Sequence, residues 1–203
     1  MGKTAFLQFE ILPFAQLPML SLSDKSVQAD VFSQTLLAQK KTTTNWRIST
    51  DADLIVRLKK IQKLIKEKQK DLHQSLFTDF RKPPIETDLS EIFAVTSEIN
   101  HAIKHLKFWM KPKSVPTPIP LIGTSGKIYY EPKGCALIIA PWNYPFNLAI
   151  GPLVSAIAAG CTAIIKPSEL TPNTSSLIQR MITELFDPSE VAVFQGESDV
   201  AQE

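Results

Sequence analysis

The sequence predicts an α/β protein in which an N-terminal antiparallel pair of helices precedes an incomplete β-α-β-α-β parallel sheet with a short β-hairpin strand. Two observations predict this class. Apolar residues recur at helical spacing over residues 51–111, and short apolar strands alternate with helices over residues 127–203. With 203 residues, 44% of them hydrophobic and 21% charged, the chain is long enough to bury a substantial core.

Two amphipathic helices are predicted within residues 51–111, after residues 1–50, which show no sustained periodicity and are expected to be an extension or a loosely packed lead-in. Thr50 is placed to cap the first helix. The apolar stripe of this helix consists of Leu54, Leu58, Ile61, Ile65, Leu72 and Leu76. The helix should end near Pro83, because proline disfavours helical geometry in the residue before it. The second helix presents on one face Ile92, Val95, Ile99, Ala102, Ile103, Leu106 and Trp109.

A Pro- and Gly-rich segment, residues 112–126, separates the helical pair from the α/β part. Its prolines lack a backbone donor and have a fixed φ, so it is predicted to be an extended connector that is neither a helix nor a central strand; they are Pro112, Pro116, Pro118 and Pro120. Residues 127–130 then alternate like a short strand. This connector is the clearest boundary along the chain.

Residues 127–203 are predicted to contain an incomplete parallel sheet. Its strands are expected at residues 135–140, 162–166 and 191–195, and its helices at residues 146–159 and 172–186. Helical crossovers of this kind are right-handed, and ligands bind at the carboxyl ends of the strands, where helix N-termini offer unpaired N–H groups. A sheet of this size leaves an open edge and an uncovered face, which calls for a partner chain or further segments.

Charge and cysteine usage narrow the functional classes. The formal net charge is +2, and the basic residues are mixed with acidic ones except along one helix, so charge does not favour nucleic acid as a partner. That basic run, and the pair His101 and His105, are interpreted as solvated faces, and no metal site is expected. Cys135 and Cys161 lie in apolar runs and fit a reducing compartment. With neither a membrane span nor a signal peptide expected, a cytoplasmic protein is predicted.

Two unusual segments follow the first two predicted strands of the parallel sheet. One is Ile-Ala-Pro-Trp-Asn-Tyr-Pro-Phe at residues 139–146, and the other is Ile-Ile-Lys-Pro-Ser-Glu at residues 164–169, with Ala-Ala-Gly-Cys at residues 158–161 between them. Together they resemble the NAD(P)-dependent aldehyde dehydrogenase family, most closely its fatty and medium-chain branch. The resemblance covers the N-terminal portion of the family from about Asp51 onward. It implies a partial Rossmann-like cofactor domain and oxidation of an aldehyde to a carboxylate through a cysteine thiohemiacetal.

Asn143 is the candidate catalytic residue. Oxidation through a thiohemiacetal places negative charge on the former carbonyl oxygen, and a fixed neutral donor in such a position contributes about 2.7–4 kcal/mol in comparable enzymes. An amide held between Pro141 and Pro145 suits that task, and the resemblance implies that Asn143 is the donor. The alternative is that Asn143 caps the helix from Phe146 or stabilises the turn.

The candidate cofactor-binding residues are Ile139, Ala140, Pro141, Trp142, Lys166 and Glu169. The resemblance implies that Lys166 and Glu169 contact the hydroxyls of the adenosine ribose. Glu accepts two hydroxyl protons and repels a 2′-phosphate, whereas Lys attracts one, so the cofactor is NAD or NADP. The alternative is a solvated ion pair that caps the helix after it. The other four would line the cofactor cleft, although Trp142 could also be a core aromatic.

The resemblance requires a thiolate nucleophile, a general base and a phosphate-binding turn that this chain does not supply. Cys135 and Cys161 occupy positions where a small apolar residue is expected, so neither is predicted to be the nucleophile. Two other hypotheses stay open: a truncated, inactive derivative that acts as a nucleotide-binding or interaction module, and a helical interaction protein centred on residues 51–110. Residues 127–130 would carry subunit contacts in a homodimer, and a small-molecule aldehyde would be the substrate.

Overall fold

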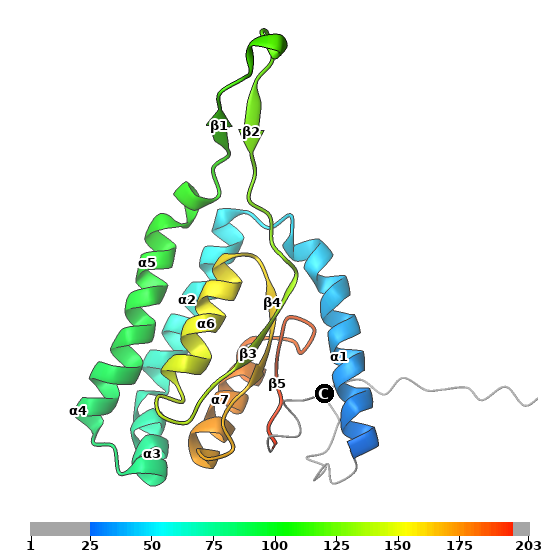
Figure 1. Cartoon of the computed structure of the whole chain (residues 1–203). Helices are drawn as coiled ribbons and strands as arrows, with labels where there is room; N and C mark the ends of the chain where they lie inside the picture. Colours follow the sequence, from blue (N-terminus) through cyan, green and yellow to red (C-terminus); the bar gives the residue numbers. More distant parts are fainter. Residues whose placement is uncertain (1–24, 197–203) are drawn as a thin grey trace, which may run out of the picture.

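The structure, a computed structural model, describes residues 25–196 as a helical layer packed against a small parallel sheet, with a hairpin projecting from one end (Figure 1). The α-helices are α1 (Lys25–Trp46), α2 (Asp51–Glu67), α3 (Gln69–Phe80), α4 (Pro84–Thr87), α5 (Phe93–Trp109), α6 (Asn147–Ala158) and α7 (Pro172–Leu185). A π-helical turn is η2 (Asp88–Ile92) and a 3₁₀ turn is η3 (Ile119–Leu121). The strands are β1 (Lys113–Val115), β2 (Gly126–Ile128), β3 (Cys135–Ile139), β4 (Thr162–Lys166) and β5 (Val191–Val193).

The predicted β-α-β-α-β unit is confirmed. Strands β3, β4 and β5 form a parallel sheet in that order, connected by α6 and α7. All five residues of β4 are buried, as expected of a central strand with both faces covered. Helix α6 stops two residues before Gly160, whose φ of 75° is the left-handed conformation that ends many helices. The packing of β3 beside β4 brings the ends of these two strands to one edge of the sheet.

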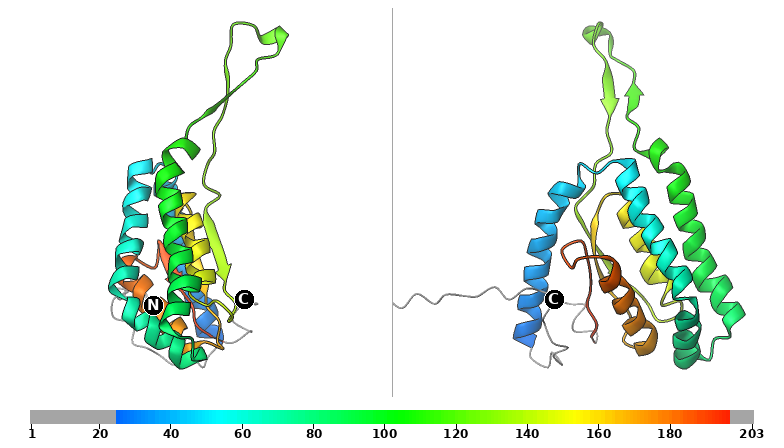
Figure 2. Two further views of the ribbon diagram at one scale, coloured as in Figure 1. Left: turned by 90° about the vertical axis from the view of Figure 1, so that its left-hand side faces the viewer. Right: turned by 180° about the vertical axis from the view of Figure 1, so that it is seen from behind.

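Helix α1 corrects the prediction of a loosely packed lead-in. Residues 25–46, within the segment 1–50, form a helix that covers the face of the sheet opposite α6 and α7 (Figures 1 and 2). Gln39 is fully buried; its amide donates to the carbonyls of Ala163 (2.9 Å) and Pro188 (3.0 Å). The anchoring side chain is therefore polar: it bonds to the backbone of β4 and of the connection before β5, and no apolar stripe marks this helix. Residues 1–24 lie outside the described part.

The helical layer follows the predicted pattern with one interruption. Thr50 caps α2 in a capping box: its hydroxyl accepts from Asp53 N–H, and the Asp53 carboxylate accepts from Thr50 N–H at 2.9 Å. The Thr50 hydroxyl also donates to the Asp53 carboxylate at 2.7 Å, and this bond, followed by the one from Thr50 N–H, lowers the pKa of Asp53. The first predicted helix is divided at Lys68 into α2 and α3, and it ends at Arg81, whose φ is 61°. Helix α2 then packs against both α5 and α6, so the helical pair and the sheet share one core.

The connector is more ordered than predicted. Within residues 112–126, β1 pairs antiparallel with β2, so that Lys113 lies opposite Ile128, and η3 forms the tip of the resulting hairpin. A strand of three residues is possible because Pro112 and Pro116 flank β1 rather than interrupt it. The strand predicted at residues 127–130 is observed only as Gly126–Ile128. The hairpin extends beyond the rest of the described chain (Figure 2).

Replacing Gln39 should test the role of α1. Gln39→Leu leaves the carbonyl of Ala163 in β4 and that of Pro188, before β5, without this donor, which we expect to lower the free energy of unfolding by about 1–3 kcal/mol in urea denaturation. Gln34→Leu is the matched control, because Gln34 is exposed on the same helix and should change stability by less than about 0.5 kcal/mol. Equal effects of the two substitutions would show that α1 does not depend on Gln39.

Candidate active site

The carboxyl edge of the sheet brings most of the predicted cofactor-binding residues together. Ile139, the last residue of β3, lies opposite Lys166, the last residue of β4. The N–H of Ala140 extends this pairing by donating to the carbonyl of Lys166 at 3.0 Å. Ala140 is buried, whereas Ile139 and Pro141 are exposed. Two exposed residues therefore flank a buried one at the strand end, where ligands of parallel α/β folds bind.

Asn143 is exposed in the loop that follows β3, four residues before α6. The alternative role as a helix cap does not agree with the structure: Phe146 occupies the N-cap position of α6, and no side chain caps the helix from there. Instead, the N–H of Asn147 donates to the Glu91 carboxylate at 2.8 Å. The Asn143 amide is thus not used to start α6.

Trp142 is not a core aromatic, because 52% of its surface is exposed. Its ring lies 6.2 Å from the ring of Phe80, the last residue of α3. Tyr144, on the other side of Asn143, is also partly exposed and lies over the ammonium of Lys82, 4.8 Å from the ring centroid. The two aromatic neighbours of Asn143 therefore contact the segment that ends α3.

Lys166 and Glu169 form an ion pair, with 2.7 Å between Nζ and Oε2. The Lys166 side chain is 7% exposed and that of Glu169 is 38% exposed, so the carboxylate is the charge that solvent reaches. The hydrogen bond from Lys166 holds the pKa of Glu169 below its usual range. The alternative of a solvated ion pair that caps the following helix does not agree with the structure, because Lys166 is buried and the first turn of α7 is bound by another carboxylate.

That carboxylate is Asp79, near the end of α3. It accepts from the backbone N–H groups of Asn173 (3.2 Å) and Thr174 (2.8 Å), and also from the Thr174 hydroxyl (2.7 Å). Together with Glu91 at α6, it fills the helix N-termini that the sequence analysis expected to offer unpaired N–H groups to a ligand. A phosphate group would have to compete with a protein carboxylate at either position.

Neither cysteine lies near Asn143. Cys135 is the first residue of β3 and pairs in register with Thr162, so it stands at the amino edge of the sheet. Its thiol donates to the side-chain oxygen of Gln39 at 2.8 Å, and burial raises its pKa. Cys161 is buried directly before β4. The raised pKa of Cys135 disfavours a nucleophilic role for it, and both cysteines lie at the opposite edge of the sheet from Asn143. Among the residues described, no group of His, Cys, Asp and Glu could hold a metal ion.

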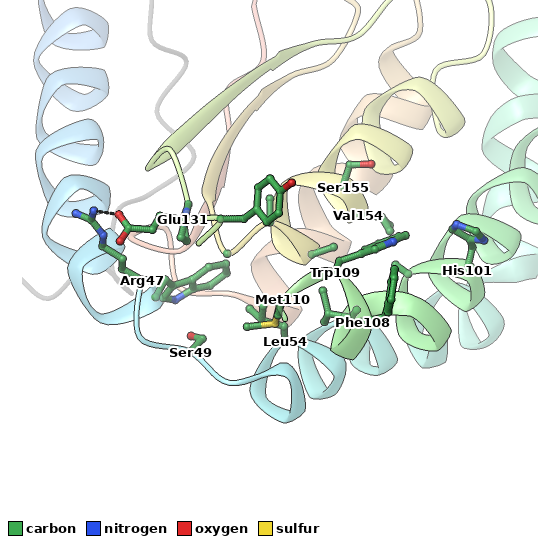
Figure 3. Close-up of a pocket in the computed structure, with 18 of the residues that line it drawn as sticks. Arg47, Ser49, Leu54, His101, Phe108, Trp109, Met110, Glu131, Val154 and Ser155 are labelled. Atoms are coloured by element: carbon green, nitrogen blue, oxygen red, sulfur yellow. Dashed lines mark hydrogen bonds and ion pairs between the residues drawn. The ribbon is translucent and has the colours of Figure 1, made fainter. Parts of the chain in front are cut away.

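A separate pocket of about 580 Å³ lies away from this edge (Figure 3). It is lined by the ends of α1, α5 and α6, with Trp46, Trp109 and Tyr130 among its walls, and an Arg47–Glu131 ion pair at one side. His101 and His105, which were interpreted as a solvated face, stack with Trp109 along α5. None of the predicted site residues borders this pocket.

The exposed amide of Asn143 and the carboxylate of Glu169 lie at the carboxyl edge of a parallel sheet, where ligands of α/β folds bind. The profile described as "Aldehyde dehydrogenase family" matches residues 11–203, and the chain belongs to this family. Among curated relatives, 4,4′-diaponeurosporen-aldehyde dehydrogenase of Staphylococcus aureus is 49% identical over 139 residues, which cover 68% of this chain and 30% of the relative. An aldehyde dehydrogenase of Craterostigma plantagineum is 35% identical over 177 residues, 87% of this chain and 36% of the relative.

Solved structures give the same family and fold. A substrate-bound state of Staphylococcus aureus AldH has a TM-score of 0.81 at 42% identity, covering 84% of this chain and 37% of that one. An NADP-dependent enzyme of E. coli shares the fold with a TM-score of 0.75 at 24% identity, over 85% of this chain and 35% of that one. The chain thus spans about a third of the length of these relatives. No helix in the described part of the chain could cross a membrane.

The Asp79 carboxylate should contribute measurably to stability. Asp79→Ala removes the acceptor for two backbone N–H groups of α7, and we expect a loss of about 1 kcal/mol, within the range of helix-cap substitutions. Urea denaturation would measure it, with Gln74→Ala on the exposed face of α3 as the control. Restoration of stability by Asp79→Asn would support capping; a loss no larger than that of the control would contradict it.

The pKa of Glu169 should depend on Lys166. Lys166→Met removes the hydrogen bond that depresses this pKa, so the pKa should rise toward its usual range, as measured by NMR titration of the carboxyl carbon. Because the folded-state pKa is depressed, the pair stabilises the fold above the unfolded-state pKa, and this contribution is lost as the pH falls through the folded-state pKa. Lys133→Met, a change at an exposed lysine, should leave the Glu169 titration unchanged.

Proposed function

We propose that this chain supplies the oxyanion-binding amide and the adenosine-ribose site of an NAD(P)-dependent aldehyde dehydrogenase, which oxidises an aldehyde to a carboxylate. The observation that carries the proposal is the placement of Asn143: an exposed amide on the loop after β3, beside the strand end that carries Lys166 and Glu169. Family membership supports the reaction class.

The Asn143 amide would act on the oxygen of the substrate. When a thiolate adds to the aldehyde carbon, the carbonyl π electrons move onto oxygen, and a donor already in position stabilises that charge without reorganising. The carbon then gives up hydride, for which NAD(P), when bound, is the acceptor, and water releases the carboxylate from the thioester. Cys135 and Cys161 are unsuited to the addition, so the thiolate would come from a segment other than residues 25–196.

The ribose site fits NAD better than NADP. Lys166 is buried and already neutralised by Glu169, whereas the Glu169 carboxylate is partly exposed and keeps acceptor capacity for ribose hydroxyls. The charge presented to a 2′-phosphate is therefore negative. Ile139, Ala140, Pro141 and Trp142 would line the adjoining cleft, since three of the four are exposed at the same edge.

The second candidate function is an interaction module without turnover. It is favoured by large exposed apolar side chains on and beside the hairpin, which are Ile119, Leu121, Ile122, Ile128, Tyr129 and Tyr130. In an intact enzyme the same surface would carry the subunit contacts of a homodimer, and the compartment would be the cytoplasm.

Asn143→Ala is the decisive substitution for the main proposal. In an enzyme where this chain is continuous with a thiolate and a general base, turnover should fall by about 10²–10³-fold, the cost of removing one such donor. Cofactor affinity, measured by calorimetric titration, should stay within about twofold, because the Asn143 amide would act on the substrate oxygen.

The cofactor titration also separates the candidate functions. Equal losses of turnover and cofactor affinity would overturn the role of Asn143. Measured on the 203-residue chain, binding of NAD would favour a nucleotide-binding role over a purely helical interaction protein. Glu169→Gln should narrow the preference for NAD over NADP, and an unchanged preference would show that Glu169 does not face the ribose.

A further inference from the structure

A buried ion pair lies beneath the loop that carries Asn143. Lys82 Nζ is 2.6 Å from Glu91 Oε1, and the two side chains are 7% and 0% exposed. Removing two charges from water costs several kcal/mol per ion, and apolar replacements are often as stable as a buried pair. A contribution to stability is therefore a weak explanation for a buried Lys82–Glu91 pair. The contacts of the two side chains indicate a further role.

Glu91 reaches the start of α6 with its second oxygen. Oε2 accepts from the N–H of Asn147 at 2.8 Å, and the Asn147 side chain donates back to the carbonyl of Ser90 at 3.1 Å. Glu91 and Ser90 belong to η2, a π-helical turn, and such turns are rare and frequent at functional sites. One turn of the helical layer therefore fixes the backbone four residues after Asn143.

Lys82 contacts the other end of the same loop. Its ammonium lies 4.8 Å from the ring centroid of Tyr144 and 5.7 Å from that of Phe80, and the Phe80 ring packs against Trp142. A cation over an aromatic face is stabilising, more so where water is excluded. Both neighbours of Asn143 are thus held by residues 80–82, while Glu91 holds Asn147.

We propose that Lys82 and Glu91 are positioning residues for Asn143: the pair fixes the loop at residues 141–147 and so sets the direction of the Asn143 amide. The proposal rests on the oxyanion role proposed above for Asn143. An oxyanion donor must point at the place where charge develops, and a shift of about 1 Å can cost about 10²-fold in rate. The buried pair meets this need because it connects the segment after α3, the η2 turn and the loop at one point.

The test uses the double variant Lys82→Met/Glu91→Met, which removes both charges without leaving either one unpaired. Its urea stability should fall by no more than that of Asp79→Ala, because the N–H of Asn147 loses its acceptor while no buried charge is left unpaired. Amide hydrogen exchange at Asn147 should nevertheless become about tenfold faster or more, as expected for loss of a hydrogen bond to a charged acceptor. The amides of the buried strand β4 should keep their protection.

A matched control is the surface ion pair of Lys68, between α2 and α3, and Glu184 on α7, separated by 3.7 Å. Lys68→Met/Glu184→Met should leave exchange at Asn147 unchanged. If exchange at Asn147 and in β4 rises in parallel, or if the control has the same effect as Lys82→Met/Glu91→Met, the pair is merely structural and the proposal fails. The single variant Lys82→Arg, which keeps the charge, should preserve protection at Asn147.

Turnover separates this proposal from the function on which it rests. In the continuous enzyme, Lys82→Met/Glu91→Met should lower kcat at least tenfold with KM for NAD nearly unchanged. Suppose that Asn143→Ala abolishes most turnover, but Lys82→Met/Glu91→Met speeds exchange at Asn147 and leaves kcat unaltered. That result would overturn the positioning role of the pair and leave the oxyanion role of Asn143 standing. No effect of Asn143→Ala on turnover would instead overturn the oxyanion role, whatever the exchange rates show.

Discussion

Two carboxylates from the helical layer hold the ends of the sheet helices, and the site depends on them. Asp79 binds the first turn of α7 and Glu91 that of α6, each from a segment more than fifty positions earlier in the chain. Helix N-termini carry a partial positive charge and unpaired donors, so each contact satisfies backbone groups and fixes a helix relative to the layer. The Glu91 contact fixes the start of α6 and therefore also the end of the loop between β3 and α6.

Sequence reasoning succeeded where the determinants are local. The spacing of apolar residues located the strands and helices of the parallel sheet, and Thr50 with Asp53 forms a capping box within four residues of chain. The motifs that nominate Asn143, Lys166 and Glu169 lie at or within four residues of the ends of β3 and β4, and the roles of these residues stay predictions. Parallel pairing of β3 and β4 places these residues at one edge of the sheet. The sequence could therefore predict which residues lie near one another, but not the direction of each side chain.

The features that sequence reasoning missed depend on contacts between distant segments. Helix α1 covers the sheet through Gln39, a polar residue that no periodicity marks. Glu91 directly precedes Ile92, the first apolar position of the expected second helix, and only the fold shows that it is fully buried against Lys82 and Asn147. Neither residue stands out in the sequence, because Lys40 follows Gln39 directly and Ser90 precedes Glu91. Their partners could not be identified without the fold.

The charge at the carboxyl edge limits what this part of the chain can bind by itself. Glu91 and Asp79 occupy the helix N-termini, and Glu169 presents a third carboxylate to solvent. Such an edge accepts hydrogen bonds from ribose hydroxyls but repels a diphosphate, which needs donors or positive charge nearby. The proposed binding of a whole dinucleotide would therefore require a phosphate-binding element beyond these helices, and the described edge would select the adenosine end of the cofactor rather than provide most of its affinity.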